Sequence, residues 1–302
     1  TLDDLITSSV EYRLNSDVPI GTFLSGGIDS SLVTSIASAK YGGKLQTFTL
    51  GFDQAIFDEA PLAKKVSLHC DTSHNEIYLK TQSLPELIEK ILSIWSEPFG
   101  DTSAIPTAIL SEFASKAVKV VFSADGGDEL FAGYNKYDSI TKKLGLSKSL
   151  GRFPFLATCN GLVEKLMEKS AYPSVNQTFD TVQNTLRLIA MERSDLIACS
   201  SYIYNSLWKQ KLLDISADNL QKERPSRIVS DIDLMLYLDT KNYLPNNVLC
   251  KVDRATMAFG LEGREPLLDF RLVEFAAKLP SNYKIRRGEK KFFLKQLARN
   301  YL

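Results

Sequence analysis

The sequence predicts an α/β protein in which a doubly wound, mostly parallel sheet is followed by a mainly helical half. Three observations support this prediction. Strand-like apolar runs alternate with helix-period segments through about residue 130. Two of these runs end in glycine turns, at the usual place for a ligand in such a sheet. Strand signals then fade beyond Tyr137. We therefore place the α/β core at residues 1–137 and the helical half at residues 138–302.

The elements of the core follow in the order helix, strand, helix. Residues 2–14 carry apolar side chains at helical spacing and predict an amphipathic helix that ends before Pro19. The run 20–24 predicts a strand, and a glycine turn then leads into a second helix containing Leu32 and Ile36. Further strands are predicted at residues 45–50, 75–79 and 118–122, and further helices at 60–66, 84–95 and 105–117.

The second half carries mainly helix-period stretches. These lie at residues 163–167, 186–191, 232–243, 272–279 and 292–297. The segment 144–177 contains three glycines and two prolines, which predicts an irregular connection or a mobile region.

Composition sets limits on partners and compartment. The 36 basic and 36 acidic residues balance, so net charge offers no argument for a nucleic-acid or membrane partner. The four cysteines form no CxxC pair, which argues against a zinc knuckle or a disulfide scaffold. No apolar run approaches the roughly 20 residues of a membrane helix. We expect a soluble, cytoplasmic protein and, because it opens at Thr1, a piece of a longer chain.

The first glycine turn, SGGIDSS at residues 25–31, has the features of a phosphate-binding loop. Its two glycines allow close backbone approach, and its serine hydroxyls stand beside a new helix N-terminus. The spacing matches neither GxxxxGK[ST] nor GxGxxG, which argues against kinase-like handling of a γ-phosphate. The alternative is an ordinary tight turn with a helix cap.

Acidic residues occur in both glycine turns. A carboxylate about 4 Å from a phosphate is repelled by roughly 4 kcal/mol at an effective dielectric constant near 20, so Asp29 beside a phosphate requires a cation. The second turn places Asp125, Asp128 and Glu129 around two glycines. Mg²⁺ takes one or two carboxylates together with phosphate oxygens. We therefore predict a magnesium site with one carboxylate from each turn, Asp29 from the first and Asp128 from the second. The alternative is a pair of solvated acidic turns.

Two later segments carry dense charge. The basic run 286–291 leads into an apolar stretch at 292–297, so it is either a solvated charge run or the source of an inward-pointing lysine. In the segment 251–269, charged residues alternate with apolar ones. These charges either form a structural ion-pair network or present an arginine to a substrate carboxylate.

Five segments together resemble the glutamine-dependent asparagine synthetase family. SGGIDSS resembles the pyrophosphate loop of N-type ATP pyrophosphatases, and SADGGDELFAGY at 123–134 resembles the family's second signature. KVDRATMAFGLEGREPLLD at 251–269, EPFGDTSAIPT at 97–107 and KKFFLK at 290–295 are similar to further family segments. The resemblance covers nearly the whole chain. It implies the C-terminal synthetase domain of that family, with an adenine nucleotide alpha-hydrolase-like fold.

The resemblance implies an ATP- and Mg²⁺-dependent amide synthesis. Aspartate attacks the α-phosphate to give β-aspartyl-AMP and pyrophosphate, and ammonia then displaces AMP. The implied catalytic residues are Lys291, at the α-phosphorus, with Asp125 and Asp29. The implied nucleotide site consists of Leu24, Ser25, Gly26, Gly27, Asp29, Ser30, Leu50, Ser123 and Ala124, with Mg²⁺ on Asp29 and Asp128. Asp253, Glu262 and Arg264 are the candidate substrate residues.

The resemblance also implies partners and departures. The family has an N-terminal glutaminase domain that begins with a catalytic cysteine, and we expect it to be absent here because the chain starts at Thr1 and its first cysteine is Cys70. Ala124 replaces a frequent glycine, and Glu265 a common valine. Amidation of another carboxylate, such as a uronic acid, is therefore an alternative. So are a non-catalytic nucleotide-binding module and a structural partner subunit. Small-molecule substrates are implied, nucleic acid and membrane are not, and a homodimer is allowed.

Overall fold

The computed structural model describes residues 1–79, 88–89, 93–97, 99–150 and 230–302. The described chain belongs to two compact units. One unit consists of Thr1–Ala132 with Thr240–Leu302, and the other is Gly133–Asp239. The helices predicted at 163–167 and 186–191, most of the one at 84–95 and most of the irregular segment 144–177 lie outside the described residues.

A five-stranded sheet forms the centre of the first unit, and all of its strand pairs are parallel. Its order is β3-β2-β1-β4-β5. The strands are β1 (Ile20–Phe23), β2 (Gln46–Phe52), β3 (Ser73–Leu79), β4 (Val120–Phe122) and β5 (Glu262–Arg264). The predicted parallel α/β architecture is confirmed. Strand β5 was not predicted, because its sequence EGR has no apolar run and it pairs with β4 from a distant part of the chain.

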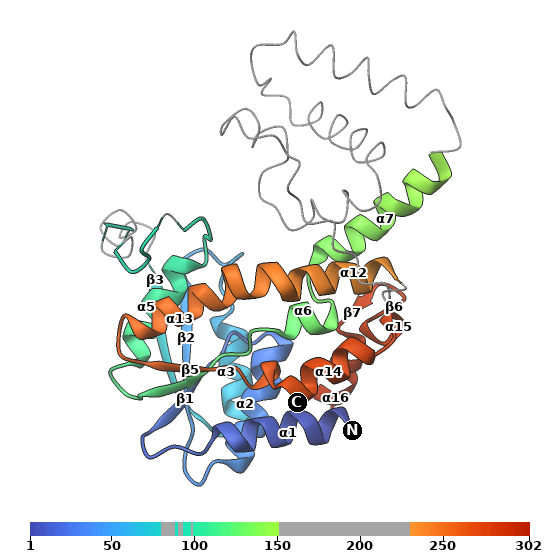
Figure 1. The fold of residues 1–302 in the computed structure, drawn as a ribbon. Helices are drawn as coiled ribbons and strands as arrows, with labels where there is room; N and C mark the ends of the chain where they lie inside the picture. The colour runs from blue at the N-terminus through green and yellow to red at the C-terminus, as the bar shows by residue number, and fades with distance from the viewer. Residues whose placement is uncertain (80–87, 90–92, 98, 151–229) are drawn as a thin grey trace, which may run out of the picture. The chain divides into compact units, whose positions relative to one another are not determined.

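Helices cover both faces of this sheet, as the alternation of strand side chains requires. Val120 and Phe122 pack into one apolar cluster, which includes residues of α1 (Leu2–Arg13), α2 (Ile28–Lys40), α14 (Phe270–Lys278) and α16 (Phe292–Ala298). Val121, between them in sequence, packs into another cluster with Ala114 of α5 (Ala104–Ala114). Ala108 of α5 in turn belongs to one apolar cluster with Ala255 of α13 (Cys250–Met257). Figure 1 shows α5 and α13 running side by side.

The compact units do not follow the predicted boundary between residues 137 and 138. Residues 240–302 belong with the N-terminal 132 residues. The physical reason is apolar burial, because α14 and α16 supply Leu272, Leu294 and Leu297 to the main core. The described part of this unit also contains α3 (Ala60–His69), α6 (Gly127–Phe131), η4 (Pro266–Leu268), α15 (Ser281–Lys284), β6 (Ile285–Arg286) and β7 (Glu289–Lys290).

The second unit is described at its two ends, α7 (Asn135–Leu150) and α12 (Asp231–Leu238). The buried carboxylate of Asp239 accepts hydrogen bonds from Lys136 Nζ at 2.7 Å and Tyr137 OH at 2.6 Å. The helix predicted at 232–243 is α12 continued as the π-helix η3 (Asp239–Leu249). Within the described residues, no helix combines the length and the apolar character that a membrane span requires.

Candidate active site

A cavity of about 480 Å³ lies where the strand order of the sheet reverses. Strand β1 has β2 on one side and β4 on the other, so the turns after β1 and β4 emerge next to each other at the carboxyl edge. This switch point is the usual ligand site of an open α/β sheet. Both glycine turns line the cavity, with Ser25, Gly27, Asp29 and Ser30 from the first and Ser123, Ala124, Asp125 and Asp128 from the second.

Two serine hydroxyls hold the first turn in place. The hydroxyls of Ser25 and Ser30 lie 2.9 Å apart, Gly27 N donates to Ser25 Oγ at 3.2 Å, and Ser30 Oγ donates to the Gly27 carbonyl at 3.2 Å. No side chain caps the N-terminus of α2 at Gly27. Gly26 has a φ of +78°, and a Cβ there would lie 2.8 Å from Ala63 N. Gly26 therefore shapes the turn but does not line the cavity, whereas the uncapped helix end faces it and favours an anion.

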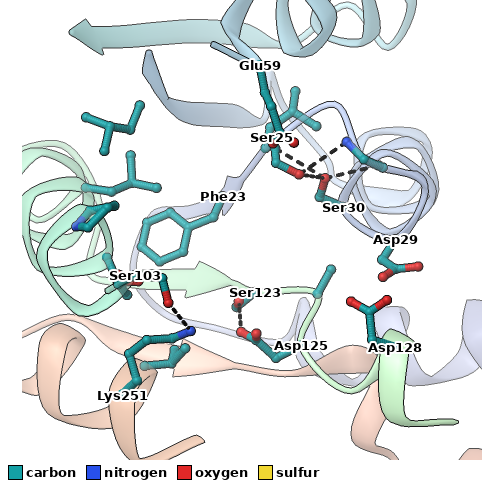
Figure 2. Close-up of a pocket in the computed structure, with 18 of the residues that line it drawn as sticks. Phe23, Ser25, Asp29, Ser30, Glu59, Ser103, Ser123, Asp125, Asp128 and Lys251 are labelled. Carbon is teal, nitrogen blue, oxygen red and sulfur yellow. Dashed lines mark hydrogen bonds between the residues drawn. The ribbon is translucent and has the colours of Figure 1, made fainter. Parts of the chain in front are cut away.

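Asp29 and Asp128 converge on one side of the cavity, as Figure 2 shows. Lys291 Nζ lies between them, 2.7 Å from Asp128 Oδ1 and hydrogen-bonded to Asp29 Oδ2. The absence of a side chain at Gly127 permits this approach, because a Cβ there would be 2.5 Å from the Asp29 carboxyl carbon. Lys291 itself has a φ of +53° at the start of α16. Segments separated by 262 residues thus form one charged cluster.

Burial and mutual charge shift the titration of this cluster. Burial raises the pKa of Asp29 to about 6, and the Asp128 charge adds to the rise while Lys291 opposes it. Burial opposes the charging of Lys291, but Asp29 and Asp128 more than offset it, so its pKa lies above the usual value. Lys291 is therefore a cation at neutral pH, with two carboxylates as counter-ions.

The residues of this cluster fit a magnesium ion. Asp29 Oδ1 is buried and has no hydrogen-bond partner, although the other oxygen of the same carboxylate is paired with Lys291. An unpartnered buried oxygen opposite a second carboxylate is a donor set that a hard divalent cation takes. Among the described residues no group of three or more His, Cys, Asp or Glu side chains is placed to hold a metal. A Mg²⁺ ion at Asp29 and Asp128 would thus depend on phosphate oxygens and water for its remaining ligands.

Asp125 occupies the middle of the cavity and Lys251 its other side, as seen in Figure 2. Ser123 Oγ donates a hydrogen bond to Asp125, whose pKa is raised by burial. Lys251 Nζ donates to Ser103 Oγ at 2.7 Å. Sequence reasoning did not single out Lys251, Ser103 or Glu59, all of which line the cavity. The first two lie within the segments 251–269 and 97–107, so their segments, though not their roles, were recognisable.

The three predicted substrate residues are not among the residues that line this cavity. Arg264 Nε donates to Glu262 at 2.7 Å, and Arg264 Nη1 donates to the carbonyls of Arg13 and Asn15 at 2.5 and 2.9 Å. The two carbonyl contacts tie β5 to the end of α1, and the contact with Glu262 is an ion pair within β5 itself. Asp253 lines a second cavity of about 280 Å³.

Glu265 also lines this second cavity. Burial raises its pKa to about 8, the charges of Asp125 and Asp253 add to the rise, and Arg13 opposes it. An acid whose pKa is higher in the folded than in the unfolded chain stabilises the fold below its unfolded pKa. That contribution is lost as the pH rises through its folded value.

Replacing Glu265 with Gln should therefore stabilise the fold at high pH. We expect a gain of about 2 kcal/mol in unfolding free energy at pH 9 and a gain near zero at pH 4. The pH 9 figure is smaller than the pKa shift alone would give, because the Glu265 side chain is partly exposed and solvent screens its charge. Urea denaturation of both proteins at a series of pH values measures the difference. A gain that is the same at pH 4 and pH 9 would contradict a raised pKa at Glu265.

The sheet and its turns define an α/β protein with a cavity at the switch point of its strands, which is the usual place for a ligand in such a fold. The chain belongs to the asparagine synthase family, whose profile matches residues 1–302. The glutamine-hydrolyzing asparagine synthetase 1 of Bacillus subtilis is 31% identical over 302 residues, covering 98% of this chain and 46% of that protein. A putative glutamine-hydrolyzing asparagine synthetase 2 of Methanocaldococcus jannaschii is 35% identical over 268 residues, covering 84% of this chain and 48% of that protein.

The chain thus spans about half the length of these curated relatives. Among solved structures, the NH3-dependent NAD synthetase of Campylobacter jejuni aligns at a TM-score of 0.33 and 11% identity, covering 64% of this chain and 97% of that one. A U34-tRNA thiolase of Methanococcus maripaludis aligns at a TM-score of 0.34 and 11% identity, covering 90% and 79%.

Proposed function

We propose that this chain is the synthetase part of an amide-forming ligase that adenylates a carboxylate with ATP and transfers the acyl group to ammonia. The observation that carries the proposal is the convergence of Asp29, Asp128 and Lys291 beside the uncapped N-terminus of α2. A helix end suits the β- and γ-phosphates, and paired carboxylates suit Mg²⁺. A bound Mg²⁺ would neutralise charge on the triphosphate and on the departing pyrophosphate. Family membership supports the same reaction.

The proposed chemistry has two steps. In the first, a carboxylate oxygen bonds to the α-phosphorus as the bond to the bridging oxygen of pyrophosphate breaks. Lys291, a buried cation at the phosphate end, stabilises the negative charge that develops there. In the second, ammonia attacks the acyl carbon, AMP leaves with the carboxylate oxygen, and the nitrogen loses a proton. Asp125, whose pKa is raised by burial, is suited to accept that proton.

Oxygen transfer tests this proposal directly. The purified chain would be incubated with ATP, Mg²⁺, ammonium chloride and aspartate labelled with ¹⁸O in its side-chain carboxylate. We expect AMP and pyrophosphate in equal amounts, one ¹⁸O atom in AMP, and asparagine as the amide. Formation of ADP and phosphate, or AMP without label, would overturn acyl adenylation.

The choice of acid is tested in the same assay. We propose aspartate because the curated relatives are named asparagine synthetases. A uronic acid that releases AMP in place of aspartate would identify the alternative amidating ligase. We further propose that a glutaminase domain supplies ammonia in the whole protein, since those relatives are named glutamine-hydrolyzing and are about twice as long as this chain.

A further inference from the structure

The charged side chains that line the 480 Å³ cavity are mostly acidic. They comprise Asp29, Glu59, Asp125 and Asp128, against the two lysines Lys251 and Lys291. An acid substrate and a triphosphate would both add negative charge to the same space. Two like charges about 4 Å apart repel by roughly 4 kcal/mol at an effective dielectric constant near 20. An anionic acid therefore binds there only where a cation can hold it.

Lys291 is already engaged at the phosphate end of the cavity. Its Nζ contacts both Asp29 and Asp128. Lys251 lies on the opposite side, beyond Asp125, as Figure 2 shows. Of the described residues that line the cavity, Lys251 is therefore the basic side chain available to a second anion.

The residues around Lys251 hold its ammonium group in place but do not use all of its hydrogen-bond donors. The side chain is 13% exposed, and Nζ donates to Ser103 Oγ at 2.7 Å. Lys251 Nζ also lies 3.4 Å from Asp101 Oδ2, and that oxygen already accepts a hydrogen bond from Asn247 Nδ2 at 2.9 Å. An ammonium group has three N–H donors, so these contacts leave hydrogen-bonding capacity for a ligand.

Both carboxylate oxygens of Asp101 accept hydrogen bonds in this arrangement. Its other oxygen, Oδ1, accepts from Ser103 N at 2.8 Å and from Ser103 Oγ at 2.6 Å. Burial alone would raise the pKa of Asp101, but the Ser103 hydrogen bonds and Lys251 more than offset it, so the pKa is lowered. Asp101 thus stays ionised as an anchor. Ser103 is the N-cap residue of α5, and Thr107 of that helix also lines the cavity. The first turn of α5 adds a positive helix end to the same wall.

We infer that Lys251 binds a carboxylate of the acid substrate, with Asp101, Ser103 and Asn247 as the residues that position its ammonium group. This inference rests on the proposed function, because it assigns a place to the acid that the reaction consumes. It makes Lys251 a determinant of affinity for the acid rather than for ATP. The two lysines then divide the work, with Lys291 at the phosphates and Lys251 at the acid.

Binding of the acid can be measured without turnover. Calorimetry would titrate aspartate into the chain preloaded with Mg²⁺ and α,β-methylene-ATP, for wild type, Lys251→Met and Lys251→Arg. We expect the Kd for aspartate to rise about 10- to 100-fold in Lys251→Met and to stay within about fivefold in Lys251→Arg. The Kd for the nucleotide should change less than about threefold in either variant. Lys278→Met is the matched control, since that lysine is 78% exposed on α14.

One further measurement and the pattern of outcomes separate this inference from the proposed function. Asn247→Ala, which removes a positioning contact, should raise the KM for the acid while changing kcat less than about threefold. An unchanged acid Kd in Lys251→Met, or an equal loss of nucleotide binding, overturns the role of Lys251 even if the wild-type chain releases pyrophosphate. A wild-type chain that binds acid through Lys251 but forms no AMP overturns the proposed function and leaves this inference intact.

Discussion

Replacing Lys291 with Met should lower the rate of pyrophosphate release about 1,000-fold while the Kd for ATP stays within about threefold of wild type. In the proposed reaction the buried Lys291 cation stabilises the charge that develops on the α-phosphate, so we expect its loss to affect the transition state more than the ground state. Single-turnover release of pyrophosphate, with ATP binding measured separately, gives both quantities. Losses of the same size in binding and in turnover would contradict a role at the transition state.

This result also decides between catalysis and a non-catalytic nucleotide-binding module. A module that only binds ATP would show no pyrophosphate release in the wild type. The matched control is Lys295→Met, one turn further along α16. The Lys295 side chain is 40% exposed, and its Nζ lies 3.6 Å from Glu289 Oε1. We expect the control to keep full activity. Thermal melting of both variants checks that the loss of the shared counter-ion of Asp29 and Asp128 has not unfolded the chain.

Replacing both Asp29 and Asp128 with Asn should make pyrophosphate release undetectable at 1 mM Mg²⁺, a loss of at least about 1,000-fold. Each asparagine keeps the size of the side chain but removes the charge that would hold the metal. A single Asp128→Asn change leaves Asp29 in place, so we expect its activity to recover partly as Mg²⁺ is raised to 50 mM. Pyrophosphate release against Mg²⁺ concentration measures both effects.

The matched control for this pair changes two acids of the same kind elsewhere on the chain. Asp17 is exposed, and Asp71 is 91% exposed at 3.1 Å from Lys44, so Asp17→Asn with Asp71→Asn removes equal charge at the surface. The control should retain the wild-type dependence on Mg²⁺. Full pyrophosphate release from the Asp29, Asp128 double variant would refute a metal site at these two residues.

Much of the fold was predictable because its elements carry local patterns. Strand β1 and helix α2 follow from an apolar run, a glycine turn and a helical repeat that are contiguous in sequence. Strand β5 was not predictable in this way, because the residues of EGR form a strand only by pairing with β4, about 140 residues earlier. The same dependence explains the division into units, since the cover that α14 and α16 provide for the sheet depends on packing across the chain.

The candidate site also has parts that were predictable from local sequence and parts that were not. The glycine turns and their acids were found from sequence because close backbone approach requires glycine and paired acids require a cation. The placement of Arg264 could not be found from sequence, because its partners are backbone carbonyls at the end of α1. Lys251 was overlooked because nothing local distinguishes it from a surface lysine. The role we propose for it rests on Asp101, Ser103 at the N-cap of α5 and Asn247 of η3, which surround its ammonium group.

The sequence by itself determined the order of the first four strands, the two acidic glycine turns and the family to which the chain belongs. These depend on short-range periodicity and on residue types that a turn or a ligand requires. Tertiary structure alone decided that Lys291 lies between Asp29 and Asp128 and that Lys251 faces them across the cavity. Charges far apart in sequence interact only after the sheet and its helices have brought them within a few ångströms, because Coulomb energy depends on distance in space.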